Sequence, residues 1–290
     1  MNKSLSNFIV AVDSNCDLNM NVCLKNKIIP LQLTYVMDDI KYIDNMEERN
    51  YKTFYNKMRK GIGCKTYNAN IYEYMNFWYN LLKYNLPILH ICAGSGINNS
   101  YSNALIARQT IIESSVNAKI YIIDSTLTSL GCGVLALKAV EHRNNNIDIE
   151  STYKLLEEIK LNINTCYATK NLKYLNYNDR IANKKRIKGT KILSIDKNGK
   201  LVLVNKKIHD NKVIKSIKEN IEKNIVSPDD QTLYICYADN YVNAKIYGEK
   251  IKEELKFKNV FYSSIGPTNG CVTGPDFIAM YYFGNKRISN

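Results

Sequence analysis

Histidine is scarce in this chain, and closely paired cysteines are absent. The three histidines, His90, His142 and His209, show no metal-ligand spacing to a cysteine or carboxylate, so we expect no zinc or other metal site. The eight cysteines form no CxxC pair and are scattered, several of them within apolar strand patterns. We therefore expect buried free thiols.

Long apolar segments are also missing. No run reaches the ~18 consecutive apolar residues of a membrane-spanning helix. The first residues, MNKSLSNFIVAVDS, pass straight into a strand pattern, with polar residues where the apolar core of a signal peptide would lie. These absences favour a soluble, cytoplasmic protein.

Recognisable nucleic-acid-reading elements are absent too, although the net charge is +13. The chain has no helix-turn-helix, zinc finger or RNP-type aromatic motif. Its basic residues cluster loosely between 184 and 215, and its 22 tyrosines are spread along the chain. We expect no nucleic-acid partner. The charge favours an acidic protein partner, transient contact with an anionic lipid surface, or solvation alone.

The length of 290 residues favours two domains, which we place at 1–160 and 161–290. Strand and helix patterns alternate through the first half, which predicts a mostly parallel sheet with helices on both faces. The second half mixes helices with strands and a hairpin signal at Asn198-Gly199, which predicts a partly antiparallel sheet. The expected fold class is therefore α/β, with a ligand site at the carboxyl ends of the parallel strands.

Local patterns predict individual elements of the first half. Phe8–Asp13 and Ile28–Met37 each resemble one extended strand, and Asp17 resembles a helix cap. Cys64–Asn70 is expected to be a polar loop, with Asn70 capping a helix over Ile71–Leu82.

The segment Pro87–Arg108 is the strongest candidate for a site. Its pattern predicts a buried strand that passes through the turn Gly94-Ser95-Gly96 directly into a helix. The free amides and dipole of a helix N-terminus favour an anion, and the Ser95 hydroxyl would add a donor. The alternative is that the two glycines only close a tight turn.

Acidic residues at two strand ends invite two interpretations. Asp13-Ser14 and Asp124-Ser125 follow predicted strands, where Asp and Ser commonly cap the next helix. Together with Asp276, they could instead serve an enzyme that binds a phosphate ligand at the same helix terminus. His90, inside a strand pattern and without an evident partner, is expected to be a packed core residue.

Taken in order, the motifs resemble those of the DegV family of bacterial fatty-acid-binding proteins over nearly the whole chain. The residues that carry the resemblance are Val12-Asp13-Ser14, Asp17-Leu18, Ile29-Pro30-Leu31, Tyr42-Ile43-Asp44, Lys65-Thr66, Gly94-Ser95-Gly96-Ile97, Ser100-Tyr101, Ala104, Ile123-Asp124-Ser125, Gly131, Gly133, Asn171-Leu172-Lys173-Tyr174-Leu175, Arg180-Ile181, Ile265-Gly266-Pro267, Gly270 and Thr273-Gly274-Pro275.

The resemblance implies a carrier, without catalytic residues or a cofactor, that encloses one fatty acid in an apolar tunnel between two α/β domains. It implies that Thr66 and Ser95, with the turn at Gly94 and Gly96, bind the carboxylate. Further headgroup or partner contacts are implied at Arg180, Val272, Thr273 and Gly274. A separate fatty acid kinase is the implied partner, to which the carrier presents the carboxylate.

The chain departs from the family pattern at several of these positions. Val272 stands where the family usually has a histidine, and Asp276 where it has a glycine. Asn98 replaces the second serine of the central turn, and Tyr67 replaces a serine after Thr66. A degenerate member that keeps the fold without binding fatty acid is therefore a further alternative.

Overall fold

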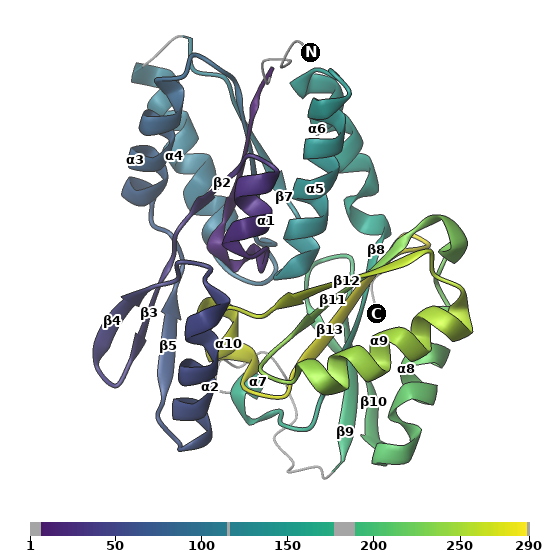
Figure 1. The fold of residues 1–290 in the computed structure, drawn as a ribbon. Helices are drawn as coiled ribbons and strands as arrows, with labels where there is room; N and C mark the ends of the chain where they lie inside the picture. The colour runs from purple at the N-terminus through teal and green to yellow at the C-terminus, as the bar shows by residue number, and fades with distance from the viewer. Residues whose placement is uncertain (1–6, 115–116, 177–188, 289–290) are drawn as a thin grey trace.

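The computed structural model describes residues 7–114, 117–176 and 189–288, which form three sheets and their helices (Figure 1). The expected α/β class is confirmed. The first sheet has the order β2-β1-β6-β7, and all of its neighbouring strands are parallel. Its strands are β1 (Ile9–Asp13), β2 (Ile28–Leu31), β6 (Ile88–Cys92) and β7 (Ile120–Asp124).

Helices cover both faces of this parallel sheet, as the alternating pattern predicts. Alternate residues of β1 point to opposite faces, so Ile9 and Ala11 pack with one set of helices while Val10 and Val12 pack with another. The helices on the two sides are α3 (Ile71–Leu82) and α4 (Ser100–Ser114) against α5 (Leu130–Asn144) and α6 (Ile149–Ile159), with the short α1 (Met20–Lys25).

The second sheet is mixed and has the order β10-β9-β8-β13-β11-β12. Only β11 and β12 are parallel among its neighbouring pairs, and Asn198-Gly199 lies in the β9–β10 hairpin as predicted. Its strands are β8 (Ile163–Thr169), β9 (Thr190–Ile195), β10 (Leu201–Ile208), β11 (Thr232–Tyr237), β12 (Asn259–Ser264) and β13 (Ile278–Phe283).

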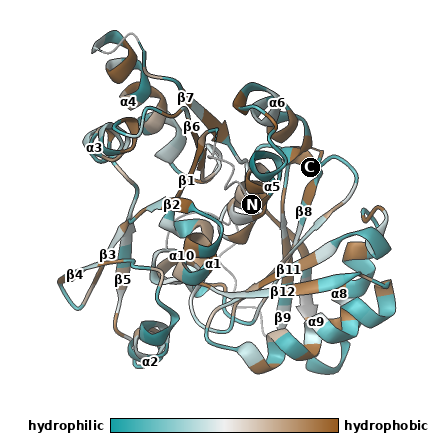
Figure 2. Cartoon of the chain, turned by 45° about the horizontal axis from the view of Figure 1, so that its top comes forward, coloured by the Kyte–Doolittle hydropathy of each residue, from teal (hydrophilic) through white to brown (hydrophobic). Residues whose placement is uncertain are grey.

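One face of the mixed sheet packs on α8 (Val213–Glu222) and α9 (Tyr241–Leu255), which lie side by side in Figure 1. Its other face shares a core with α5. Gly131 of α5 packs on Tyr281 of β13, and Gly133 packs on Cys16 and Leu18, so neither position has room for a side chain. Because α5 meets both sheets, most of its surface is buried, and Figure 2 shows apolar strands enclosed by helices with polar outer faces.

A small third sheet corrects two of the predictions. The run Ile28–Met37 is two strands, because β2 pairs in the parallel sheet while β3 (Thr34–Met37) pairs elsewhere. The segment expected to be a loop contains β5 (Cys64–Tyr67), which pairs antiparallel with β3. β4 (Ile40–Ile43) pairs with the other edge of β3, and α2 (Tyr51–Arg59) connects β4 with β5.

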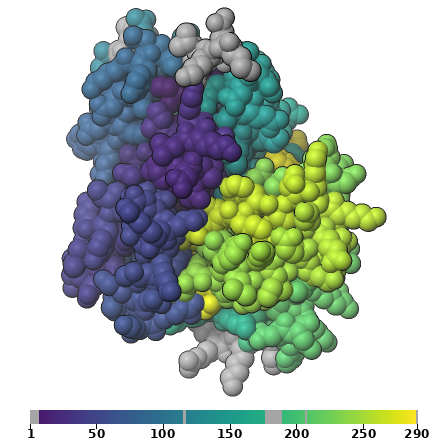
Figure 3. Space-filling model, viewed as in Figure 1, coloured from purple at the N-terminus to yellow at the C-terminus, as the bar shows by residue number. Residues whose placement is uncertain are grey.

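The remaining helices are short: α7 (Lys173–Asn176), α10 (Pro267–Thr273) and the 3-10 turns Ser14–Cys16, Glu48–Asn50, Lys160–Asn162, Asp210–Lys212 and Pro228–Asp230. The early residues (purple and blue) and the late residues (green and yellow) meet along a seam in Figure 3. The division into domains at residue 160 stays a prediction. Within the described ranges, no helix is long and apolar enough to cross a membrane.

Candidate functional site

A cavity of about 520 Å³ lies where β5, the loop before α4 and the helix α10 meet. Its volume falls within the ~300–1,000 Å³ typical of small-ligand sites. It is lined by Cys64, Lys65, Thr66, Tyr67, Asn68, Ile97, Asn98, Asn99, Cys271 and Val272.

Thr66 is the polar residue of this cavity that most clearly indicates a ligand. Its hydroxyl oxygen is buried and has no hydrogen-bond partner among the described residues. Leaving a buried polar group unsatisfied costs about 1–3 kcal/mol, so such a group usually has a partner that completes it. A ligand acceptor in the cavity would supply that partner.

A second cavity of about 740 Å³ adjoins the first, because Cys64, Lys65, Tyr67 and Cys271 line both. Its other walls come from the start of the third sheet's β3–β4 turn, from α2 and from α7. The additional lining residues are Val36, Asp38, Asp39, Met58, Ile62, Gly63, Lys173 and Tyr174. The two cavities therefore adjoin each other, with Thr66 in the wall of the first and apolar side chains beside charged ones in the wall of the second.

Ser95 lies outside the walls of these two cavities, and its polar groups already have partners. Its backbone N–H donates to Asp124 Oδ1 at 3.0 Å, and its hydroxyl donates to Asp124 Oδ2 at 2.5 Å. The turn does not lead directly into a helix, since α4 begins only at Ser100, whose N–H donates to Asn98 Oδ1. A carboxylate of the chain itself thus occupies the place where the sequence predicts an exogenous anion.

The two glycines of the turn are required for close packing. A Cβ on Gly94 would lie 2.7 Å from the backbone of Thr126, and one on Gly96 would overlap the carbonyl of Asn198. Ligand contacts of Gly94, Ser95 and Gly96 stay predictions.

The remaining implied contacts lie at or near α10. Val272 lines the cavity that contains Thr66, whereas the Thr273 hydroxyl approaches the Gly274 carbonyl at 3.4 Å. Gly274 has a φ of +71° and packs so closely on the Tyr174 ring that a Cβ there would overlap it. Arg180 lies outside the described residues.

Asp276, the acid at a family glycine position, is paired with Arg59. The guanidinium donates to both Asp276 oxygens at 2.9 Å and to Asp239 Oδ2 at 3.0 and 3.1 Å. The hydrogen bonds from Arg59, together with its charge, hold the pKa of the Asp276 carboxyl below its usual range. This pairing compensates the negative charge that would otherwise act on a bound carboxylate.

Two buried carboxylates hold the first turn of α10. Asp44 accepts from the Thr268 hydroxyl at 2.6 Å, and Asp17 accepts from the Gly266 N–H at 2.8 Å and from Asn269 at 2.7 Å. Burial raises the pKa of Asp17 to about 7 and also raises that of Asp44. Asp17 is therefore not the cap of α1, which Asn19 provides, but an anchor for a remote helix.

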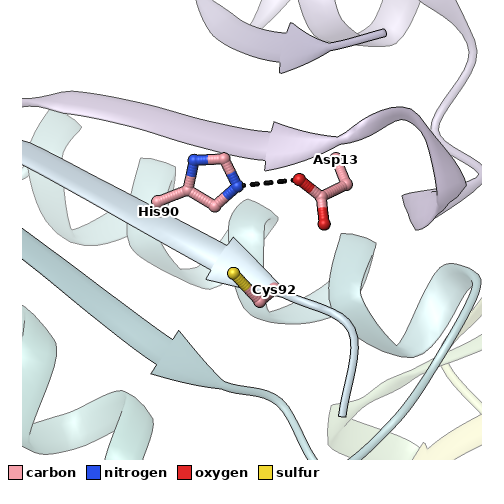
Figure 4. Close-up of side chains that lie close together, drawn as sticks. All are labelled: Asp13, His90 and Cys92. Atoms are coloured by element: carbon pink, nitrogen blue, oxygen red, sulfur yellow. Dashed lines mark hydrogen bonds and ion pairs between the residues drawn. The ribbon is translucent and has the colours of Figure 1, made fainter. Parts of the chain in front are cut away.

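A second buried network surrounds His90 in the parallel sheet (Figure 4). His90 Nε2 lies 3.1 Å from Asp13 Oδ1, Trp78 Nε1 donates to His90 Nδ1 at 3.1 Å, and the Tyr74 hydroxyl donates to Asp13 at 2.8 Å. Asp13 provides no side-chain cap, so that prediction is wrong. His90 is buried, as expected of a packed core residue, but it has partners in Asp13 and Trp78, which the sequence did not indicate.

The donor pattern of this network does not fit a metal ion, although ligand atoms of Asp13, His90 and Cys92 lie within 4.8 Å of one another. The Trp78 indole can only donate, so His90 Nδ1 must accept and Nε2 carries the proton. A metal on Nε2 would move that proton to Nδ1, against the Trp78 N–H. The spacing His90-x-Cys92 on one strand face was the sequence signal for this cluster.

Comparison with known proteins places the chain in a family. A family model described as "Uncharacterised protein, DegV family" matches residues 7–285. A DegV domain-containing protein of Clostridium perfringens is 28% identical over 289 residues, which is 98% of this chain and 99% of the relative.

Two solved structures share the fold. DegV of Bacillus subtilis, described as a fatty acid binding protein, superposes with a TM-score of 0.82 at 23% identity, covering 97% of this chain and 100% of that one. A stearic-acid-binding protein of Eubacterium ventriosum gives a TM-score of 0.85 at 18% identity, covering 96% of this chain and 98% of that one.

Proposed function

Because the chain belongs to the DegV family, we propose that it binds one long-chain fatty acid in the cleft formed by the two cavities. The carboxylate lies at Thr66, and the alkyl chain runs along the apolar walls. The observation that carries this proposal is the buried, unpartnered Thr66 hydroxyl in a cavity wall. The fatty acids named for the structures from B. subtilis and E. ventriosum support the ligand class.

The energetics of the cleft suit an amphiphile. Each buried methylene contributes about 0.8 kcal/mol, while the carboxylate needs donors because an unpaired buried charge is costly. Besides Thr66, the Asn98 side chain is oriented by its accepted bond from Ser100, which leaves its Nδ2 to donate. β5 is an edge strand, so backbone groups on its free side add further donors.

We propose that the protein acts as a cytoplasmic carrier that presents the bound carboxylate to a separate fatty acid kinase. Thr66 and Asn98 hold the ligand without supplying a nucleophile or a base, which suits a carrier. The net charge of +13 supports transient contact with an anionic lipid surface during loading.

The phosphate-binding alternative finds less support at its predicted site. Asp124 occupies the donors of Ser95, Asp13 is buried beside His90, and Asp276 is paired with Arg59. An exogenous phosphate would have to displace the Asp124 carboxylate or lie beside it, and the repulsion between like charges opposes this.

Titration with a fluorescent long-chain fatty acid tests the proposal. We expect saturable binding of one probe per chain, displaced by stearic acid and much less well by its methyl ester, which cannot present a charged carboxylate. Inorganic phosphate serves as the competing class. A phosphate that raises the melting temperature, while fatty acids of varied length and unsaturation do not, would overturn the proposal in favour of the alternative.

A further inference from the structure

Two cysteines distant in sequence line the same wall of the proposed ligand cleft. Cys64 lies on β5 and Cys271 on α10, and both line the 520 and the 740 Å³ cavities. The elements that carry these cysteines pack on each other, since β5 and α10 are in contact, and the Cys64 side chain raises the pKa of Cys271. Cys64 is half-buried, whereas the other seven cysteines are buried.

We propose that Cys64 and Cys271 form a reversible disulfide on mild oxidation and that this bond controls ligand exchange in the cleft. The second part rests on the proposed function, whereas the first does not. The bond would join β5 to α10, and therefore the strand that carries Thr66 to the helix that carries Val272.

The chemistry needs one two-electron oxidant, such as a peroxide. The Cys64 thiolate attacks one peroxide oxygen, which yields a sulfenic acid at Cys64 and releases the other oxygen as water after protonation. The Cys271 sulfur then attacks the Cys64 sulfur, the S–S bond forms, and the sulfenic oxygen leaves as a second water. Two thiols and one peroxide thus give one disulfide and two waters, and an added dithiol reverses the reaction.

Exposure decides which cysteines react. Cys64 is the more accessible of the pair, so it meets the oxidant first, and its neighbour Cys271 resolves the sulfenic acid. Besides burial, Cys23 raises the pKa of Cys16 in the same way, but both of these cysteines are completely buried, so they serve as an internal control for accessibility. We expect that pair to stay reduced under the same treatment.

The disulfide would fix the cavity wall at its second end. Asp44 already anchors the first turn of α10 through Thr268, and a bond at Cys271 would secure the last turn to β5. Cys64 and Thr66 lie on the same side of β5, since they are two residues apart in a strand. The bound ligand would in turn shield the thiols, because coupling between two events at one site is reciprocal.

The test is to oxidise the reduced protein with hydrogen peroxide, unfold it in denaturant, alkylate the remaining thiols and map the peptides by mass spectrometry. We expect two of the eight cysteines to resist alkylation and a cross-linked peptide pair that contains Cys64 and Cys271. Dithiothreitol should restore all the thiols. Cys271→Ser, with Cys271→Ala as a second variant, should instead leave a sulfenic acid at Cys64 that dimedone traps.

The ligand arm measures release of the fluorescent fatty acid before and after oxidation. Release from the oxidised protein should slow by about 5-fold or more, a typical coupling between sites, and oxidation of Cys271→Ser should not slow it. Unchanged thiols or a different cross-linked pair would overturn the disulfide, and an unchanged release rate would overturn the control of exchange. Failure of both forms to bind the probe would overturn the proposed function and the control of exchange, while the peptide map still decides the disulfide.

Discussion

At the scale of single residues, the account depends on Thr66 more than on any other side chain. The Thr66 hydroxyl is buried and has no partner in the described part of the chain, whereas the Ser95 hydroxyl donates to Asp124. An unsatisfied donor in a cavity wall favours a missing acceptor, and a fatty acid carboxylate would be a strong one. Of the two hydroxyls that the resemblance implies for carboxylate binding, that of Thr66 is thus available to a ligand, whereas that of Ser95 already has a partner.

Thr66→Val separates the ligand role of Thr66 from a structural one. The change keeps the side-chain shape and removes a hydroxyl that lacks a partner in the empty protein, so we expect stability without ligand to stay level or rise. Affinity for fatty acid should fall by about 10- to 100-fold, the loss expected for a hydrogen bond to a charged group.

Urea denaturation of the empty protein and the fluorescent-probe titration measure these two effects. Thr110→Val on the exposed side of α4 is a matched control, because its hydroxyl donates only to Ile106 of the same helix. Unchanged affinity in Thr66→Val would remove Thr66 from the site.

Val272→His tests the position where the family has a histidine. Val272 lines the same cavity as Thr66, so an imidazole there would add a donor to the carboxylate. We expect affinity to rise by up to about 10-fold, at some cost in stability from the larger side chain in a packed wall. Competition titration measures the affinity, with Val204→His on the exposed part of β10 as the control. Equal or weaker binding would count against a carboxylate beside Val272.

At the scale of elements, the short helix α10 connects the ligand cleft with the two halves of the molecule. Asp17 and Asp44 hold its first turn, and Cys271 and Val272 line the cleft from its last turn. Gly270, between these ends, packs on the rings of Phe54 and Tyr55 and leaves no room for a side chain. The position of one cavity wall therefore depends on two buried carboxylates.

The raised pKa of Asp17, about 7 when folded against 3.8 as its ordinary value, predicts a pH dependence of stability. The folded protein holds a proton that the unfolded chain releases. Its stabilising contribution is complete below about pH 4 and is lost as pH rises towards about 7. Asp44, also raised, acts in the same direction.

Asp17→Asn should remove this part of the dependence. Between about pH 4 and pH 7 the free energy of unfolding of the unchanged protein should fall relative to the variant, on the order of 1–4 kcal/mol. Denaturant unfolding at several pH values gives the free energy of unfolding of both proteins. The difference between them isolates Asp17, because the contributions of the other ionisable groups are the same in both. A constant difference over that range would refute the protonated Asp17.

The sequence correctly predicted those elements that depend only on residues close together in the chain. Strand β6, the glycine turn after it and the helix capped by Asn70 follow from neighbouring residues, and Asn70 forms the full capping box with Glu73. The failures involve distant partners. β5 has only four residues, two of them exposed, and is a strand because β3 pairs with it, while Asp17 anchors a helix about 250 residues away.

For the candidate site too, contacts between residues distant in the sequence could not be predicted. The resemblance placed Thr66 and Val272 in one site, and both line one cavity. The hydrogen bond of Ser95 to Asp124 depends on how the ends of β6 and β7 meet, and the shared cavity wall of Cys64 and Cys271 depends on how α10 packs on β5. Neither contact has a local sequence signal.

At the scale of the whole molecule, one exposed cation links the early and late parts of the chain. Arg59, at the end of α2, bonds Asp239 after β11 and Asp276 before β13. Its side chain is 41% exposed, so each ion pair is expected to contribute less than about 1 kcal/mol. The shared core around α5, rather than this bridge, holds the two sheets together.

Arg59→Met should lower the free energy of unfolding at neutral pH by less than about 1 kcal/mol. The lowered pKa of Asp276 contributes stability that is fully present above its ordinary pKa of 3.8 and is lost as pH falls through the lower pKa of the folded state, so the effect of the substitution should shrink on acidification. Arg49→Met, which breaks a pair with Glu47 in the same turn, is the control and should change stability less. An effect of several kcal/mol would show that the bridge holds the sheets together.

The central claim is that the molecule carries one fatty acid, and native mass spectrometry of gently purified protein tests it most directly. We predict a mass higher than that of the chain by one long-chain fatty acid, which lipid extraction then identifies. Thr66→Val, purified in the same way, should retain less of it. Protein that is consistently empty, and that no fatty acid of any length or unsaturation stabilises, would contradict the claim.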